Sequence, residues 1–170
     1  MTSRRRLIVM RHGKSEPFGA SDHERALTER GARSAADAGR HLAQTGSAPD
    51  YAVVSSAVRT QQTWDACAET SGSHAEVSVD EAVFSGSADV VLEALRAVPE
   101  GTEVLVFVGH NPSAACLAAQ LDDGDGDAEA ISAMLQGFPS GALVTFEVEV
   151  PWAELATETG RVVDFYIGQG

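Results

Sequence analysis

An Arg-His-Gly triplet at residues 11–13 constrains this chain most, because it follows directly on a short apolar run that is typical of a buried strand. Two further apolar runs are followed closely by a cation or an imidazole. Residues 51–54 precede Arg59, and residues 104–108 precede His110. In open α/β sheets the ligand crevice lies beyond the carboxyl ends of the strands. Three strands are therefore expected to bring two arginines and two histidines to one edge of one sheet.

This set of side chains suits a phosphoryl group. The guanidinium groups of Arg11 and Arg59 can each form paired hydrogen bonds with phosphoryl oxygens. The imidazole of His12 can attack phosphorus, provided that one ring nitrogen is free and a hydrogen bond holds the other. Nearby arginines disfavour the protonated ring and help to keep it neutral near pH 7. Because glycine has no side chain, the backbone N–H groups around Gly13 are expected to approach the anion closely.

Each of these residues also has a plainer interpretation. His12 and His110 could be structural histidines at strand ends, and Arg59 could face solvent from the first turn of a helix. Helical side chains lean toward the N-terminus, however, so Arg59 should point back toward its strand, where the positive helix end also favours an anion. Arg25 lies in the loop after the first strand, and by itself could be a surface cation. The shared location of the other residues favours an anion site.

The alternation of strand and helix patterns predicts an α/β fold with three layers, α/β/α, around a central, mostly parallel sheet. We find no repeat or linker, and expect a single domain over residues 1–170. The expected strands are residues 7–10, 51–54, 75–79, 103–108, 143–150 and 161–167. The expected helices start at the N-cap residues Thr28 and Ser56, near Val90, and at Asn111 with Pro112 in the first helical position. Residues 11–27 and 80–87 are expected to be loops.

The charge balance disfavours nucleic acids and anionic membranes as partners, since 25 Asp and Glu stand against 12 Lys and Arg. The basic run at residues 4–6 is expected to be a solvated lead-in to the first strand. The apolar stretch after it is too short for a signal peptide, and no run reaches membrane-spanning length. We therefore expect a cytoplasmic protein. Cys67 and Cys116 are expected to be buried free thiols rather than a metal or redox pair.

The acidic run that begins at Asp122 matches a calcium-binding loop only in part. Asp123, Asp125 and Asp127 alternate as such a loop requires, but Ala128 replaces the required glycine and Met134 stands at the position of the closing glutamate. The run is therefore expected to be an acidic loop without a metal.

The motifs resemble those of the histidine phosphatase superfamily, the phosphoglycerate-mutase-like group. They are RHGKSE at residues 11–16, SSAVRTQQT at 55–63 and VGHNP at 108–112. Within that superfamily the chain is similar to the short SixA-type phosphohistidine phosphatases. The supporting features are DHERALTERG at residues 22–31, FPSGAL at 138–143, and the short segment between Arg59 and His110. The resemblance covers nearly the whole chain and implies a phosphoglycerate-mutase-like fold.

The resemblance also implies a two-step reaction that needs no metal or cofactor. His12 would be the nucleophile that becomes phosphorylated. Arg11, Arg59 and His110 would bind the phosphoryl oxygens and stabilise the transition state, and water would then release inorganic phosphate. Arg25 matches an arginine that reaches the same pocket in SixA-like proteins.

Two points stay open under this resemblance, the proton donor and the substrate. Glu81 falls about where many members carry a carboxylic acid that protonates the leaving group, with a surface salt bridge as the alternative. A phosphohistidine substrate needs such an acid less, because its leaving imidazole can depart protonated. The predicted function is dephosphorylation of phosphohistidine in a protein partner. The alternatives are a phosphatase for small phosphorylated metabolites and a non-catalytic phosphate-binding module.

Overall fold

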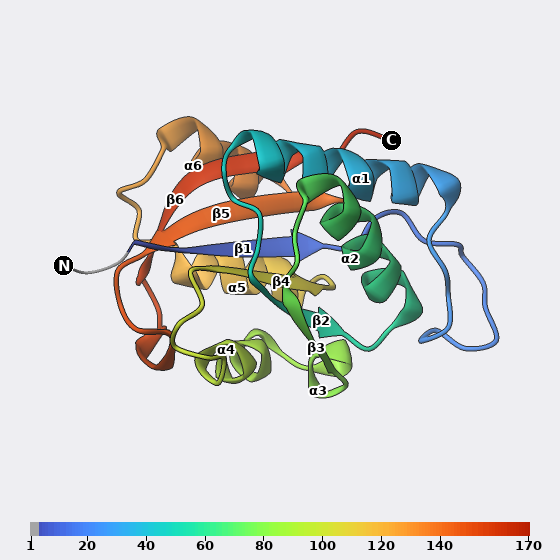
Figure 1. Ribbon diagram of the computed structural model, residues 1–170, viewed down its shortest axis with the longest axis horizontal. Coiled ribbons are helices and arrows are strands. Elements are labelled where there is room, and N and C mark those ends of the chain that lie inside the picture. Colours follow the sequence, from blue (N-terminus) through green and yellow to red (C-terminus); the bar gives the residue numbers. More distant parts are fainter. Residues whose placement is uncertain (1–3) are drawn as a thin grey trace.

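The computed structural model describes residues 4–170, and its sheet forms where the apolar runs predict it. Six strands lie in the order β3-β2-β4-β1-β5-β6 (Figure 1). They are β1 (Arg5–Arg11), β2 (Tyr51–Ser55), β3 (Glu76–Asp80), β4 (Val104–Gly109), β5 (Ala142–Val148) and β6 (Gly160–Ile167). The first four are parallel, whereas β5 runs antiparallel to β1, and β6 antiparallel to β5. The predicted α/β fold with a mostly parallel sheet is confirmed.

Helices cover both faces of this sheet and complete the three predicted layers (Figure 1). On one face lie α1 (Glu29–Gln44) and α2 (Val58–Ser71). On the other lie α4 (Ala88–Arg96), α5 (Ser113–Leu121) and α6 (Ala128–Gln136). A short helix, α3 (Ala82–Ser85), follows β3, and a 3₁₀ turn, η1 (Trp152–Glu154), connects β5 to β6. No helix within residues 4–170 is long and apolar enough to cross a membrane.

The central strand β1 separates two apolar cores, because successive side chains of a strand point to opposite faces. Leu7 and Val9 pack with residues of α4 and α5, whereas Ile8 and Met10 pack with residues of α1 and α2. All four side chains are fully buried. The unbroken apolar run of this strand is therefore that of a strand covered on both faces. Strand β1 leaves the apolar core at Arg11. The polar residues that follow Arg11 can therefore lie only at the edge of this core.

The start of α2 differs from the prediction. Ser56 does not cap the helix, because the N-cap residue is Ala57 and no side chain accepts the first N–H groups. The Val58 N–H instead donates to the His23 carbonyl oxygen, at 3.0 Å, and the Ser56 hydroxyl lies 3.0 Å from His23 Nε2. The loop after β1 is therefore bound to the start of α2 and supplies part of its cap.

The cap of α1 is confirmed, while two short helices were missed. The Thr28 side chain accepts a hydrogen bond from the Gly31 N–H. Residues 80–87, predicted to be a loop, contain α3, and α6 follows the acidic run, where the Asp127 side chain accepts from the Ala130 N–H. The four residues of α3 are too few to show an apolar stripe, and α6 buries Met134 alone, so it carries no stripe comparable to those of α4 and α5.

Two predictions for α5 were wrong. Pro112 is the N-cap residue rather than the first helical residue, and the Asn111 side chain accepts from the Ala115 N–H at 3.3 Å. Cys116 is exposed, because it lies off the stripe of buried residues that α5 turns to the core. Cys67 is buried, as expected.

Gly39→Ala should destabilise the protein, although alanine is the better helix former. A Cβ on Gly39 of α1 would approach Thr70 Oγ1 of α2 to 2.0 Å and the Cys67 carbonyl oxygen to 2.3 Å. This collision outweighs the gain of about 1 kcal/mol that alanine brings to a helix interior, so we expect a net loss of about 1–3 kcal/mol. Urea denaturation measures the change. Gly101→Ala is the control, because no atom lies within 4 Å of its Cβ. Equal unfolding free energies for the two variants would contradict the prediction.

Candidate active site

The carboxyl ends of β1, β2 and β4 bring the four principal predicted residues together. Arg11 ends β1 and His12 follows it, His110 follows β4, and Arg59 is the second residue of α2, just beyond β2. Because β1 and β4 are paired in parallel register, the two imidazoles leave neighbouring strands at the same edge. Their ring centroids lie 5.3 Å apart.

The guanidinium group of Arg59 lies between these two imidazoles. Its Nε donates to His12 Nε2 at 3.3 Å, and its Nη2 lies 3.3 Å from His110 Nδ1. As predicted, this side chain leans back from the first turn of α2 toward the strand ends. A guanidinium group can only donate hydrogen bonds, so each ring nitrogen that faces it presents a lone pair.

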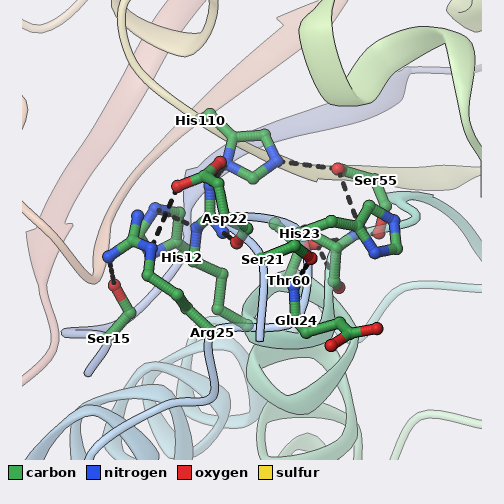
Figure 2. A network of polar contacts seen from close by, with 12 residues as sticks. His12, Ser15, Ser21, Asp22, His23, Glu24, Arg25, Ser55, Thr60 and His110 are labelled. Atoms are coloured by element: carbon green, nitrogen blue, oxygen red, sulfur yellow. Dashed lines mark hydrogen bonds and ion pairs between the residues drawn. The ribbon is translucent and has the colours of Figure 1, made fainter. Parts of the chain in front are cut away.

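Hydrogen bonds on the far side of each ring hold the complementary proton. His12 Nδ1 lies 2.6 Å from the Gly13 carbonyl oxygen. His110 Nε2 lies 2.7 Å from Ser55 Oγ, a contact that Figure 2 shows. Since Arg59 donates to the opposite nitrogen of each ring, His12 carries its proton on Nδ1 and His110 on Nε2. His12 Nε2 is therefore the free nitrogen that a nucleophile requires.

Burial and positive charge keep both rings neutral. Desolvation is the main cause that lowers the pKa of His12 to about 4, and nearby arginines lower it further. The pKa of His110 is lowered to about 3, again mainly by burial and then by the charge of Arg59. Each histidine is only 8% exposed. At neutral pH both imidazoles can thus act as lone-pair donors rather than cations.

Arg11 carries a donor that lacks an acceptor. Its Nη1 donates to the Phe138 carbonyl oxygen at 3.1 Å, and Asn111 Nδ2 donates to the same oxygen at 2.8 Å. Its Nε is buried and has no hydrogen-bond partner among residues 4–170. Leaving a buried donor unpaired costs roughly 1–3 kcal/mol. An oxygen of a bound anion is the kind of acceptor that would remove this cost.

Arg25 reaches the site from the loop after β1, and it does so together with Asp22. Its Nη1 donates to Ser15 Oγ at 3.1 Å, and its Nε donates to Asp22 Oδ1 at 3.0 Å (Figure 2). The same Nη1 donates to the Glu16 carbonyl oxygen at 2.9 Å. Asp22 Oδ2 in turn lies 3.4 Å from Arg59 Nη2. Two guanidinium groups of the site therefore share one carboxylate.

Gly13 does not present its N–H to the site, contrary to the expectation. That N–H donates to Thr63 Oγ1 at 3.1 Å. The reason for a glycine here is packing, since a Cβ would come within 2.5 Å of the Gly31 carbonyl oxygen. Gly13 thus allows the end of β1 to lie against the start of α1.

Glu81 is not brought into this cluster by any polar contact. It is exposed at the N-cap position of α3, and its side chain forms no hydrogen bond or ion pair with another residue of the described chain. Its role as a proton donor stays a prediction from the resemblance.

Three residues of the site were missed by sequence reasoning: Asp22, Ser55 and Phe84. The Phe84 ring of α3 packs edge-on against His110 and His23, with centroid distances of 5.5 Å and 4.9 Å. Asp22 and Phe84 lie in segments without periodicity, so no pattern distinguished them. Ser55 ends an apolar strand, and the rule that singled out the arginines applies to it equally.

Two clefts border the site. A cleft of about 620 Å³ adjoins His110 and is lined by Phe84, Pro112 and the exposed Cys116, among others. A second cleft, of about 840 Å³, adjoins Arg11 and lies between α6 and β6. The first cleft thus meets the site at His110 and the second meets it at Arg11.

The neutral state of the two imidazoles can be tested by an NMR titration. With pKa values of about 4 and about 3, the ring protons of His12 and His110 should keep the shifts of the neutral form as the pH falls from 8 to about 5. The same chain unfolded in urea is the control, and its imidazoles should titrate near the ordinary value of about 6.5. Because the unfolded state then binds more protons, folding stability should fall as the pH drops below about 6.5. A midpoint near that value for either ring in the folded protein would contradict the prediction.

Comparisons with known proteins agree with this geometry. The sequence profile of the histidine phosphatase superfamily (branch 1) matches residues 7–85. An uncharacterized protein of Mycobacterium tuberculosis is 32% identical over 160 residues, 93% of this chain and 99% of that protein. A solved structure described as a candidate phosphohistidine phosphatase SixA from Nakamurella multipartitia has a TM-score of 0.86 at 28% identity, over 97% of this chain and 96% of that one.

A second solved structure, the protein histidine phosphatase SixA complexed with tungstate, has the same fold. Its TM-score is 0.78 at 20% identity, over 95% of this chain and 96% of that one. The architecture predicted from the resemblance, a phosphoglycerate-mutase-like α/β fold, is confirmed by these similarities. The chain belongs to branch 1 of the histidine phosphatase superfamily, and its structure is similar to those of SixA proteins.

Proposed function

We propose that this protein is a phosphatase that works through a phosphohistidine formed on His12, and that its substrate is phosphohistidine in a protein partner. The observation that carries the proposal is the arrangement around Arg59, where the free Nε2 of a neutral, buried His12 faces a guanidinium group and a second imidazole. A nucleophile and the positive charge needed by phosphoryl oxygens therefore occupy one pocket.

The first step uses only residues of this pocket. His12 Nε2 attacks phosphorus in line, the bond from phosphorus to the leaving group breaks, and the leaving group keeps the electron pair. Arg59 and Arg11 donate to the phosphoryl oxygens, and the unpaired Nε of Arg11 gains its acceptor. Negative charge in the pocket also favours protonation of His110, which can then donate from Nδ1. Inorganic phosphate is the final product.

The state of the carboxylates supports phosphohistidine as the substrate. The side chain of Glu81 makes no polar contact with the site in the described residues. Desolvation raises the pKa of Asp22, but the ion pairs with Arg25 and Arg59 outweigh it and hold that pKa below its ordinary value. Neither residue is thus a poised acid for an alkoxide leaving group. An imidazole that leaves in its protonated form needs no such acid.

The open surface around the pocket supports a protein as the partner. Phe18, in the same loop as Asp22 and Arg25, is 86% exposed. Exposed aromatic side chains are typical of residues that become buried on binding another protein. The two open clefts beside the pocket leave room for such a partner. The tungstate bound by a SixA structure of the same fold agrees with an oxyanion in this position. The cytoplasmic location stays a prediction from the sequence.

A small-molecule phosphatase is the second candidate, and the cleft beside His110 favours it. Its volume of about 620 Å³ is within the range of small-ligand sites. A leaving group of metabolite size would fit between α3 and the start of α5.

Comparing substrates tests both candidates. The protein should release phosphate faster from a phosphohistidine-carrying domain than from phosphoserine or sugar phosphates at equal concentration, because the imidazole is the one leaving group of these three kinds of substrate that departs without an acid. Phosphate release is measured for each. Faster turnover of the small esters would favour the second candidate instead.

His12→Ala should abolish both the activity and the phosphoenzyme. A labelled phosphoenzyme that is stable in base and labile in acid should form on the wild-type protein and be absent from the variant, with activity lower by a factor on the order of 10⁴ or more. His74→Ala is the control, because His74 lies outside the site in the turn before β3. If the wild-type protein binds phosphate yet forms no phosphoenzyme, it is a binding module and the proposed function is wrong.

A further inference from the structure

The site holds a carboxylate that the resemblance did not assign. Asp22 forms ion pairs with both Arg25 and Arg59, at 3.0 Å and 3.4 Å. It is the one carboxylate among residues 4–170 that forms an ion pair with any arginine of the site. In Figure 2 its side chain is turned toward His12 and His110, whereas that of Glu24, two residues further on, is turned away.

Asp22 lies on the solvent side of the site and His12 on its buried side. The Asp22 side chain is 64% exposed, whereas His12 is 8% exposed and Arg59 is 5% exposed. A phosphoryl group attached to His12 would therefore have the nitrogen on its inner side and Asp22 on its outer side. In an in-line displacement the attacking water approaches opposite the bond that breaks, which is the outer side.

The position of Asp22 does not depend on its carboxylate alone. Arg59 Nη1 donates to the Asp22 carbonyl oxygen at 2.7 Å, and the neighbouring His23 carbonyl oxygen accepts from the Val58 N–H at 3.0 Å. When Nε and Nη2 of Arg59 donate to phosphoryl oxygens instead, these two contacts to backbone carbonyl oxygens can still hold Asp22 beside the bound phosphoryl group. The Nε donor of Arg25 can still orient its carboxylate.

We propose that Asp22 is the general base of the second step, the hydrolysis of the phosphohistidine on His12. This inference rests on the proposed function. Asp22 takes one proton from a water molecule while the water oxygen forms its bond to phosphorus. The bond between phosphorus and His12 Nε2 breaks, and its electron pair returns to Nε2. The products are inorganic phosphate, a neutral imidazole and a protonated Asp22, which releases its proton to solvent.

The charge state of Asp22 agrees with this role. Its ion pairs with the two arginines hold its pKa below the ordinary value despite desolvation, so it is ionised at neutral pH, the state that a general base requires. The same state makes it a poor acid in the first step. Asp22 thus serves the hydrolysis step. The first step depends on a leaving group that needs no proton from an acid of the protein.

Pre-steady-state kinetics of Asp22→Asn with p-nitrophenyl phosphate tests the proposal, because this leaving group departs without an acid. The variant should release a burst of p-nitrophenolate close to one equivalent per site at nearly the wild-type rate. Its steady-state rate should then fall by about 10²–10⁴-fold, the usual contribution of a general base. Labelled phosphohistidine should accumulate on the variant over the same period. Asp22→Glu should recover part of the steady-state rate.

Glu24→Gln is the matched control, because Glu24 lies in the same loop, is exposed, and is turned away from the site. Glu24→Gln should keep both the burst and the steady-state turnover at wild-type rates. Tungstate binding to Asp22→Asn shows that its anion site is intact. The assignment of Asp22 is overturned if the variant keeps its steady-state rate, or if the burst slows as much as the steady state. If neither wild-type protein nor Glu24→Gln forms a phosphoenzyme, the proposed function itself is refuted.

Discussion

The guanidinium group of Arg59 joins the two histidines of the site to the loop that follows β1. It donates to His12 from β1, lies against His110 from β4, and bonds the backbone and carboxylate of Asp22 from the intervening loop. A buried charge without partners would cost several kcal/mol, so a side chain that is 5% exposed needs all of these contacts. The same need forces the two imidazoles to turn lone pairs toward it. Burial keeps the two rings neutral, and the contacts with Arg59 help to decide which nitrogen of each ring carries the lone pair.

The protein is strongly acidic as a whole, yet it gathers positive charge in one pocket. The net charge is −13, while Arg11, Arg25 and Arg59 lie around His12. The positive charge comes from side chains that enter from three directions, and β-strand pairing sets the distances between them. A phosphoryl dianion can be attracted by this local field even though the distant surface repels it, because salt screens the distant charges more strongly.

The loop after β1 supplies the part of the site that faces solvent. It is closed at its base by hydrogen bonds between Glu16 and Ala26 and between Thr28 and Lys14. Through His23 it also caps α2, the helix that carries Arg59. Hydrogen bonds thus connect the loop, the helix and the strand ends to one another. In the reaction proposed here, strand ends carry the nucleophile and the loop carries the base, so the two steps are served by opposite sides of the bound phosphoryl group.

Strand ends were predictable from the sequence, because a buried strand needs a continuous apolar run and any polar residue that follows must lie at the sheet edge. That argument alone located Arg11, His12 and His110, and the direction of helical side chains added Arg59. Arg25 and Glu81 were placed only by the resemblance to a family. The structure shows that Arg25 contacts the site through its hydrogen bond to Asp22, and it shows no polar contact between Glu81 and the site.

The tertiary structure decided the features of the site that no periodic sequence pattern indicates. The ring tautomers follow from the Gly13 carbonyl and the Ser55 hydroxyl, which meet the two histidines only after folding. Asp22 and Phe84 reach the site from aperiodic segments, and Gly13 proved to serve packing against Gly31. The sequence by itself determined which groups arrive at the sheet edge, since apolar runs and helix direction are local properties. Which atoms of those groups face one another was decided by contacts between distant segments, which a local pattern does not encode.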